Sequence, residues 1–229
     1  MLDLHAHLLP AVDDGPVSLD ESLALCAELH RQGISEAVAT PHWASPRFPG
    51  VASDRIVAAW DLLRQAGSPL RLHLGAENHL APGVRAADFA AHARPLGEAP
   101  VALVELPDEV VPKPTWEAFF LLRQRGLRPV LAHPERCKAL ARSDPHLADY
   151  VADGGLLQLT AASLTGLHGW RMRWRSRRLL ARFPTACVIA GDTHHPTGPR
   201  RPCWAELPSR MRAWIPPSLA ALAGWQGPE

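Results

Sequence analysis

The opening stretch, MLDLHAHLLPAVDDG (residues 1–15), decides how the rest of the chain is interpreted. A short apolar run leads into His5 and His7, and an acidic pair, Asp13 and Asp14, follows. On an extended strand successive side chains alternate between faces, so His5 and His7 point to the same side. Two imidazoles side by side at a strand end form half of a metal site. The pair alone is weak evidence, so the interpretation depends on ligands from later segments.

The length and composition are those of a soluble globular protein. The chain has 229 residues, a net charge of +1 and 21% charged residues. This length allows a well-buried core and fits one α/β domain, while the balanced charge favours neither nucleic acid nor an acidic surface as the main partner. No apolar run approaches the length of a membrane span, and no signal segment precedes the first expected strand. We therefore expect a cytoplasmic protein.

The cysteines exclude two kinds of site. Cys26, Cys137, Cys187 and Cys203 are far apart and form no CxxC pair, which disfavours a zinc ribbon or a disulfide scaffold. None is followed by arginine after five intervening residues, the spacing of thiolate-type tyrosine phosphatases. If the protein is a phosphatase, it does not use a cysteinyl-phosphate.

Strand-like and helix-like segments alternate along the chain, which implies parallel βα units. An open doubly wound sheet would concentrate its ligands at one switch point, whereas here polar residues follow nearly every strand. We therefore predict an α/β fold, a distorted seven-stranded TIM-like barrel forming one domain over residues 1–229, with 203–229 as a helical tail packed on it. The expected strands are 2–4, 34–40, 70–74, 101–104, 128–132, 156–159 and 185–190, and the expected helices are 20–32, 54–66, 84–94, 115–125, 145–153 and 170–183.

The residues at the ends of these strands are nearly all His, Asp or Glu, the types that bind divalent metals. In a barrel every strand opens on one face, so they would meet there. Nine ligands exceed the capacity of one ion, so we predict two or three divalent ions; mixed His and carboxylate ligands suit Mn, Fe or Zn better than Mg. The candidates are His5, His7, Asp14, His42, Glu77, Glu105, His133, Asp192 and His194.

Each candidate also has a structural interpretation. Glu105 could pair with a core arginine, and His133 could be a hydrogen-bonded core histidine. His195 adjoins the last candidates and could lie behind the site or on the surface. In the acidic pair, Asp14 is the favoured ligand and Asp13 the favoured loop-former. Surface or core roles are favoured for the remaining histidines, His30, His73, His79, His92, His146 and His168.

The motifs DLHAHLLPAVDDG, VATPHW, GAE, VELP, LAHPER and GDTH, in this order, resemble the PHP (polymerase and histidinol phosphatase) superfamily. More narrowly, they are similar to the manganese-dependent protein-tyrosine phosphatases of capsule and exopolysaccharide gene clusters. The similarity runs from residue 1 to about 202. It implies a distorted seven-stranded PHP barrel with three metals, which dephosphorylates tyrosines in a bacterial tyrosine kinase.

The nine candidate residues match the metal-ligand positions of this family. Arg136, in HPER, matches a phosphate-binding arginine; for a second one Arg201 fits best, with Arg200 as the alternative. The segments GAENHL, LTAASLTG and GDTH depart from the family pattern without removing a ligand, which leaves the substrate more open than metal binding. The hypothesis is in-line attack on phosphorus by a metal-bridging hydroxide, without a phosphoenzyme.

Two other functions remain open. One is a PHP phosphatase of small alkyl phosphates such as histidinol phosphate; the other is a non-catalytic metal-binding module. The expected partner is a phosphotyrosine-bearing protein such as a kinase tail, with no nucleic acid and no membrane span. The basic run RMRWRSRR (residues 171–178) could recruit an acidic phosphotyrosine tail or an anionic membrane, or be a solvated helix face.

Overall fold

The computed structural model describes residues 1–143 and 145–212. Within these residues every strand pairing is parallel, and the strands form two sheets. The strands are β1 (Leu2–Ala6), β2 (Glu36–Ala39), β3 (His42–Trp43), β4 (Arg71–Leu74), β5 (Glu77–His79), β6 (Val101–Glu105), β7 (Arg128–Ala132), β8 (Leu156–Thr160) and β9 (Cys187–Ala190). The sheet orders are β1-β2-β4 and β3-β5-β6-β7-β8-β9.

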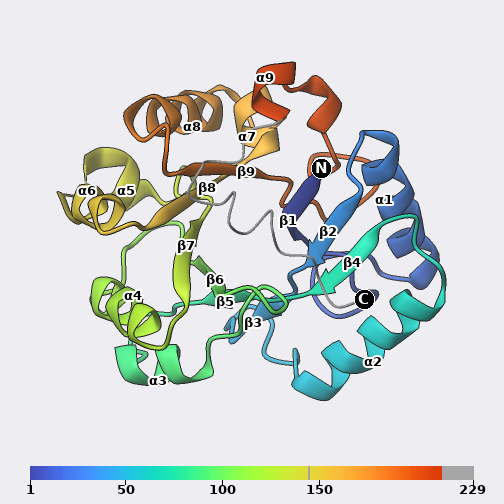
Figure 1. Cartoon of the computed structure of the whole chain (residues 1–229), viewed down its shortest axis with the longest axis horizontal. Coiled ribbons are helices and arrows are strands. Elements are labelled where there is room, and N and C mark those ends of the chain that lie inside the picture. Colours follow the sequence, from blue (N-terminus) through green and yellow to red (C-terminus); the bar gives the residue numbers. More distant parts are fainter. Residues whose placement is uncertain (144, 213–229) are drawn as a thin grey trace.

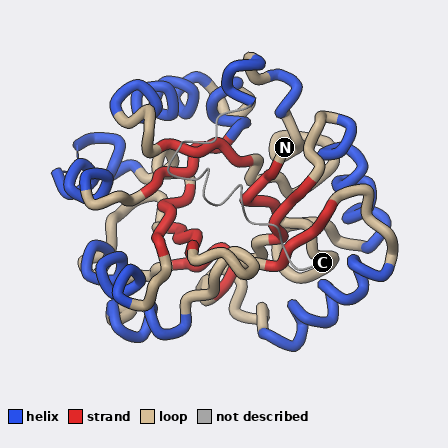
Figure 2. The backbone as a smooth tube through the Cα atoms, viewed as in Figure 1, coloured by secondary structure: helices blue, strands red, loops and turns tan. Residues whose placement is uncertain are grey.

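The helices lie outside the strands, which surround the centre of the molecule (Figures 1 and 2). They are α1 (Leu19–Arg31), α2 (Ser53–Gln65), α3 (Ala86–His92), α4 (Thr115–Gln124), α5 (Lys138–Ser143), α6 (Pro145–Ala152), α7 (Ala161–Thr165), α8 (Trp170–Arg182), the 3-10 helix η1 (Trp204–Glu206) and α9 (Ser209–Arg212). None of the described helices is long and apolar enough to cross a membrane.

The amphipathic pattern of α1 illustrates why the helices take this position. Its N-cap Ser18 accepts a hydrogen bond from the backbone N–H of Glu21, which satisfies one of the free donors of the first turn. Leu25 and Leu29, four residues apart, are both fully buried against the sheet side. The connections after the strands therefore return along the outside, as parallel pairing requires.

All seven expected strand segments are present, and two of them are followed by a short strand that was not expected, β3 after β2 and β5 after β4. Pro41 separates β2 from β3, because it has no N–H to donate to a ladder. Gly75 lies between β4 and β5, where a Cβ would come within 2.9 Å of the Leu96 and Val38 side chains. The described strands therefore form two sheets, and among the described residues their hydrogen bonds do not close a barrel.

Other differences from the expectation are smaller. Helices α5 and α7 were not expected, and most observed elements are shorter at their ends than predicted. Of the expected tail 203–229, the structure describes η1 and α9; residues 213–229 lie outside the described residues.

Two contacts connect the first and last strands. Ala6 forms an isolated parallel bridge with Thr193, and the N–H of His7 donates to the Thr193 carbonyl at 2.8 Å. The N–H of Asp192 donates to the carbonyl of His5 at 2.7 Å. The beginning of the chain is thereby tied to the segment that follows β9.

The interior below the strands' carboxyl ends is apolar. One cluster of buried side chains joins β2, β6, β7, β8 and β9 through Val38, Leu103, Val130, Leu156 and Val188. A second, larger cluster lies between the strands and the helices. The apolar interior means that polar side chains brought together above it are shielded from water on that side.

Candidate metal centre

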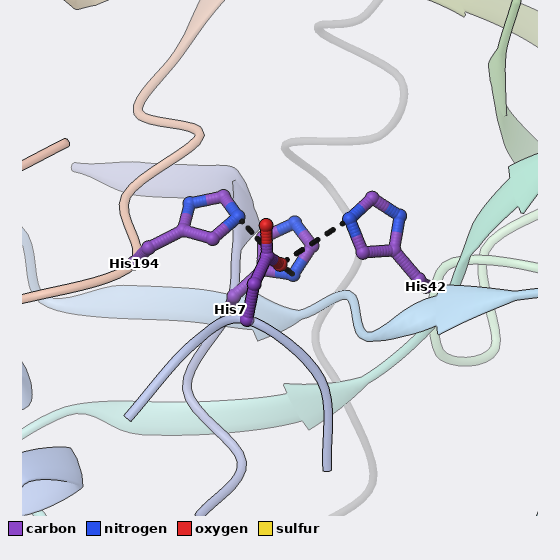
Figure 3. Close-up of side chains that lie close together, drawn as sticks. His7, His42 and His194 are labelled. Carbon is purple, nitrogen blue, oxygen red and sulfur yellow. Dashed lines mark ion pairs between the residues drawn. The ribbon is translucent and has the colours of Figure 1, made fainter. Parts of the chain in front are cut away.

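The structure brings the nine predicted ligand residues together where the parallel strands end. They form four overlapping groups, and within each group one ligand atom per residue lies within 4.8 Å of the others. His7, His42 and His194 turn their rings toward one another in Figure 3. The groups are His7, Asp14, His42 and His194; His5, Glu77 and His133; His5, His7 and Asp192; and His42, Glu77 and Glu105.

Glu77 is at the middle of the cluster. Its carboxylate is 2.7 Å from His133 Nε2 and 3.0 Å from His42 Nδ1. It is also 3.4 Å from His7 Nε2 and 3.5 Å from His5 Nε2. The β3–β5 register places His42 directly opposite Glu77, so the sheet itself sets this contact. A carboxylate surrounded by four imidazoles is suited to bridge two ions.

Asp14 occupies the other side of the cluster, in the loop between β1 and α1. Its Oδ1 is 3.3 Å from His194 Nε2, 3.4 Å from His42 Nε2 and 4.0 Å from His7 Nδ1. Its Oδ2 accepts a hydrogen bond from Arg200 Nη1 at 2.6 Å. This side chain is 32% exposed, whereas Glu77 is 1% exposed. The cluster therefore opens to solvent at Asp14.

Asp192 and Glu105 complete the set. Asp192 Oδ1 lies 3.6 Å from His5 Nε2, and its Oδ2 accepts from Arg136 Nη1 at 2.8 Å. Glu105, at the end of β6, lies 2.7 Å from His79 Nδ1. Both carboxylates thus have a second partner that holds them in place beside the histidines.

Two histidines are oriented by partners outside the cluster. His5 Nδ1 lies 2.9 Å from Gln158 Oε1 on β8, and His7 Nδ1 lies 2.8 Å from Asp13 Oδ2. Such contacts fix the tautomer and leave Nε2 as the ligand atom.

Several buried atoms facing the cluster have no hydrogen bond among the described residues. They are His5 Nε2, His7 Nε2, Asp14 Oδ1 and both ring nitrogens of His42. Buried polar atoms are normally satisfied, so this convergent set of unpaired ligand atoms fits a site for divalent cations. The donor set, imidazole with carboxylate, fits borderline divalent ions such as Mn, Fe or Zn.

Two of the nine residues have a backbone conformation that ordinary residues avoid. His133 has φ of 29° and Asp192 has φ of 49°. Non-glycine residues at positive φ are strained, by about 1–3 kcal/mol, and concentrate at functional sites. Here the N–H of Asp192 is held by the His5 carbonyl, and that of His133 by Gln158 Oε1 at 3.2 Å. The strain directs both side chains into the cluster.

The carboxylates attract positive charge to the histidines. Burial by itself lowers the pKa of His5, but the charges of Glu77 and Asp192 outweigh it and raise this pKa to about 9. Burial likewise lowers the pKa of His42, but the neighbouring carboxylates of Asp14 and Glu77 outweigh it and raise the pKa to about 10. Without an ion these imidazoles hold protons, which divalent cations would displace.

Of the two arginines favoured by the sequence, one lies at the cluster and the other does not. Arg136 lies at the cluster, with its contact to Asp192. Arg201, the residue favoured by the sequence, does not: its guanidinium pairs with Glu206 at 2.6 Å and with the carbonyl of Pro202. The alternative, Arg200, takes this place, contacting Asp14 and His194. The reason is local: the N–H of His194 bonds the Arg200 carbonyl at 3.0 Å, which closes the loop and turns Arg200 inward.

Sequence reasoning missed four residues that contact the cluster from outside: Asp13, His79, Gln158 and Arg47, whose Nη2 donates to Glu105 Oε1 at 2.8 Å. Asp13, expected to shape the loop, does accept from the Gly15 N–H but also binds His7. His79, expected on the surface or in the core, contacts Glu105. Gln158 lies on the one long strand without a ligand candidate, so no spacing pointed to it. His195 turns away from the cluster toward Glu21 of α1, at 2.8 Å.

Parallel strands that carry a buried His and carboxylate cluster at their carboxyl ends define a class, the α/β metal-dependent hydrolases. Within this class, the family model described as capsular polysaccharide synthesis, CpsB/CapC, matches residues 1–212. The chain belongs to this family. The resemblance inferred from the sequence motifs is thereby confirmed.

Named relatives support this assignment. The tyrosine-protein phosphatase YwqE of Bacillus subtilis is 30% identical over 206 residues, which cover 85% of this chain and 78% of YwqE. The tyrosine-protein phosphatase CpsB of Streptococcus pneumoniae is 26% identical over 202 residues, covering 85% and 83%. A solved structure from work on YwqE and CpsB, described as metal-dependent tyrosine phosphatases, matches with a TM-score of 0.75 and 28% identity, over 100% of this chain and 89% of the other.

Proposed function

We propose that this protein is a metal-dependent phosphatase that removes phosphate from phosphotyrosine in proteins. One observation carries the proposal: nine ligand-type residues and two arginines meet at the strand ends of a chain whose relatives are named tyrosine-protein phosphatases. A bare metal-binding module would not require two arginines beside the ligands. A phosphatase does, because the phosphate must be held against the metals.

The nine residues would hold two or three divalent ions, with Mn favoured and Fe or Zn possible alternatives by ligand type. When bound, the ions supply Lewis acidity toward the phosphoryl oxygens and activate the attacking water at neutral pH. His5, Glu77 and His133 would form one site at the buried side. Asp14 and His194 would belong to the more open side, with His7 and His42 between the two.

Arg136 and Arg200 would bind the phosphate oxygens. Both arginine side chains are about one-quarter exposed, at 27% and 26%, so they can reach a ligand from solvent while anchored to Asp192 and Asp14. A guanidinium matches two phosphate oxygens in forked geometry and keeps its charge at all relevant pH values. These two residues would therefore orient phosphorus and neutralise charge that develops during transfer.

The cysteines support a mechanism without a thiol nucleophile. All four are buried, and burial raises the pKa of Cys26 to about 11 and of Cys187 to about 12. Such thiols are not thiolates at neutral pH. A tyrosine leaving group, with a reference pKa of about 10, departs more easily than an alkoxide, so no dedicated strong acid is required.

The finer proposals concern the fold and the substrate. The tie between Ala6 and Thr193 and the shared apolar interior support a distorted seven-stranded barrel, and the family match over residues 1–212 supports a single domain.

The tail of a bacterial tyrosine kinase is the proposed substrate, supported by the family description of capsular polysaccharide synthesis. The small alkyl phosphates, such as histidinol phosphate, are the alternative.

The test combines metal analysis with a substrate panel. Purified protein should contain two or three divalent ions per chain, and excess chelator should abolish turnover of a phosphotyrosyl peptide, with recovery on adding Mn. Turnover of histidinol phosphate under the same conditions should be much lower. Activity that survives complete metal removal would contradict the mechanism, and a preference for histidinol phosphate would contradict the substrate.

A further inference from the structure

Helix α8 has an exposed face of tryptophan and arginine that the metal centre does not use. Trp170 and Trp174, one turn apart, are 74% and 55% exposed. At 100° per residue they project along the same line, and arginines flank this line on both sides. We call this the Trp-Arg face; it consists of Trp170, Arg171, Arg173, Trp174, Arg177, Arg178 and Arg182, all of them exposed.

The opposite side of α8 is packed and fixes the helix in place. Ser176 is buried, and Leu179 and Leu180 pack against the hydrophobic core. Arg175 Nη1 donates to the carbonyl of Glu135 at 3.3 Å. The helix lies at the outer edge of the molecule, beside α7 (Figure 1). The Trp-Arg face is therefore a rigid, outward-facing ridge.

The charge of this face is uncompensated. Residues 154–191 contain no Asp or Glu. Within residues 1–143 and 145–212, none of the five arginines of the face makes an ion pair. Three exposed arginines elsewhere pair with a carboxylate three residues away on or beside their helix: Arg31 with Glu28, Arg64 with Asp61 and Arg85 with Asp88.

The tryptophans and arginines of the face contact each other. The Arg171 guanidinium lies 5.4 Å from the Trp170 ring centre, and that of Arg178 lies 5.3 Å from the Trp174 ring centre. Each tryptophan ring thus has a guanidinium group beside it. Such a pair can lie at the boundary between water and an apolar phase, with the ring on the apolar side and the charge in water. The Trp-Arg face therefore combines exposed apolar surface with positive charges around it.

We propose that the Trp-Arg face binds an anionic membrane surface, with α8 lying in the plane of the interface. Tryptophan prefers the interface between water and lipid, and arginine stems extend beside it to reach lipid phosphates. Anionic lipids supply the negative charge that the face lacks. An arginine cluster alone could bind an acidic peptide, but the two exposed tryptophans beside these arginines favour a lipid interface.

The test is co-sedimentation of the full chain with vesicles. We expect at least about tenfold stronger partitioning to phosphatidylcholine vesicles containing phosphatidylserine than to pure phosphatidylcholine, and weakening at high salt, because the attraction is electrostatic. R171Q/R178Q should weaken binding about 25-fold, at about fivefold per arginine. The control R64Q/R85Q removes the same charge from paired arginines and should bind like the parent protein.

A second pair of variants separates insertion from charge alone. W170A/W174A should weaken partitioning at least about tenfold, because the apolar anchor is lost. The control F120A removes an aromatic that is 52% exposed on α4 and should have no effect. All these positions are exposed, so the variants should fold, which circular dichroism checks. Partitioning does not require turnover, so the outcome is independent of the proposed phosphatase activity.

Three results would overturn the proposal. In the first, the parent protein does not sediment with anionic vesicles. In the second, the variants of the Trp-Arg face bind vesicles as well as their controls do. In the third, the face binds a glutamate-rich peptide or oligouridine, and vesicles do not compete with that binding. The last result would instead assign the face to an acidic polymer.

Discussion

The two ends of the metal centre are built differently. The Glu77 end consists of Glu77 with His5 and His133, all buried and all at strand ends. The Asp14 end consists of Asp14 with His194 and Arg200, from the loops after β1 and β9. Asp14 is about one-third exposed. His7 and His42 contact both ends.

This difference separates two properties within one cluster: the Glu77 end is held rigidly, and the Asp14 end is accessible to solvent. Strand residues are held by the sheet ladder and cannot move without breaking it, whereas loop residues can adjust and reach solvent. We therefore expect the Glu77 end to hold its ion more tightly, and the Asp14 end to exchange its ion and receive the phosphate. Arg200 contacts Asp14 at the accessible end, which agrees with this division, whereas Arg136 contacts the buried Asp192.

The largest effect is expected from E77Q. Removing this charge leaves buried histidines without a partner, which should lower the free energy of unfolding of the chelated protein by about 3–5 kcal/mol. Turnover of phosphotyrosyl peptide should fall below detection, and the metal content should fall by more than one ion. The comparison variant D14N should lose one ion at most, with little change in urea unfolding. Equal metal loss in E77Q and D14N would contradict the proposed difference in metal affinity between the two ends.

The next effect concerns the two neighbouring arginines. R200A should lower kcat/KM for an aryl phosphate by about 10²–10³-fold, because a charged donor to the transferred group is lost. R201A should leave kcat/KM nearly unchanged and cost at most about 1 kcal/mol, because it breaks only a partly exposed pair with Glu206. Steady-state kinetics of R200A and R201A would show which of the two arginines contributes to turnover. The reverse ranking would show that this loop rearranges when substrate binds.

The third prediction is the pH dependence of the chelated protein. The folded-state pKa of His5, about 9, is above the reference value of 6.5, so its contribution to stability is complete below pH 6.5 and is lost as pH rises through 9. Urea unfolding in excess chelator should show a loss of up to about 3 kcal/mol over this window. Metal affinity should rise over the same range, because protons no longer compete.

E77Q provides the control for this measurement. Because Glu77 is the first of the charges that raise the pKa of His5, the variant should have a flatter stability profile between pH 6.5 and 9. An unchanged slope would mean that other groups cause the pH dependence.

The smallest effect is expected from D13N. The Asp13 carboxylate orients His7 through its Nδ1, and loss of such an outer partner lowers metal affinity or activity by about 10–100-fold. Titration of chelated protein with Mn should show this loss, at both ends of the cluster because His7 contacts both. D20N, an exposed change in the first turn of α1, is the matched control. Mn affinity in D13N equal to that of D20N would show that Asp13 does not orient His7 for metal binding.

Much of the site was predictable because of one topological rule. Parallel strands place their carboxyl ends on one side, so residues such as His42, Glu77 and His133 had to approach each other once the segments before them were strands. Residue type then indicated metals, and the order of motifs indicated the family. No knowledge of individual contacts was needed for either inference.

Side-chain direction and outer contacts were not predictable in the same way. Arg200 and Arg201 are adjacent and chemically identical, and only the bond from His194 to the Arg200 carbonyl decides which one faces the cluster. Gln158 reaches His5 across 153 residues of sequence, so no local pattern could reveal it. The division of the strands into two sheets likewise depends on how Pro41 and Gly75 pack.

The amino-acid sequence by itself determined the alternation of strands and helices, the parallel α/β class, the family and the nine residues that meet. These follow from local propensity and from residue type at strand ends, which are properties of short segments. Only the tertiary structure decided the sheet division, the inward arginine, the outer partners Asp13, His79 and Gln158, and the unequal exposure of Glu77 and Asp14. Those depend on distances between distant segments, which packing sets and local sequence does not record.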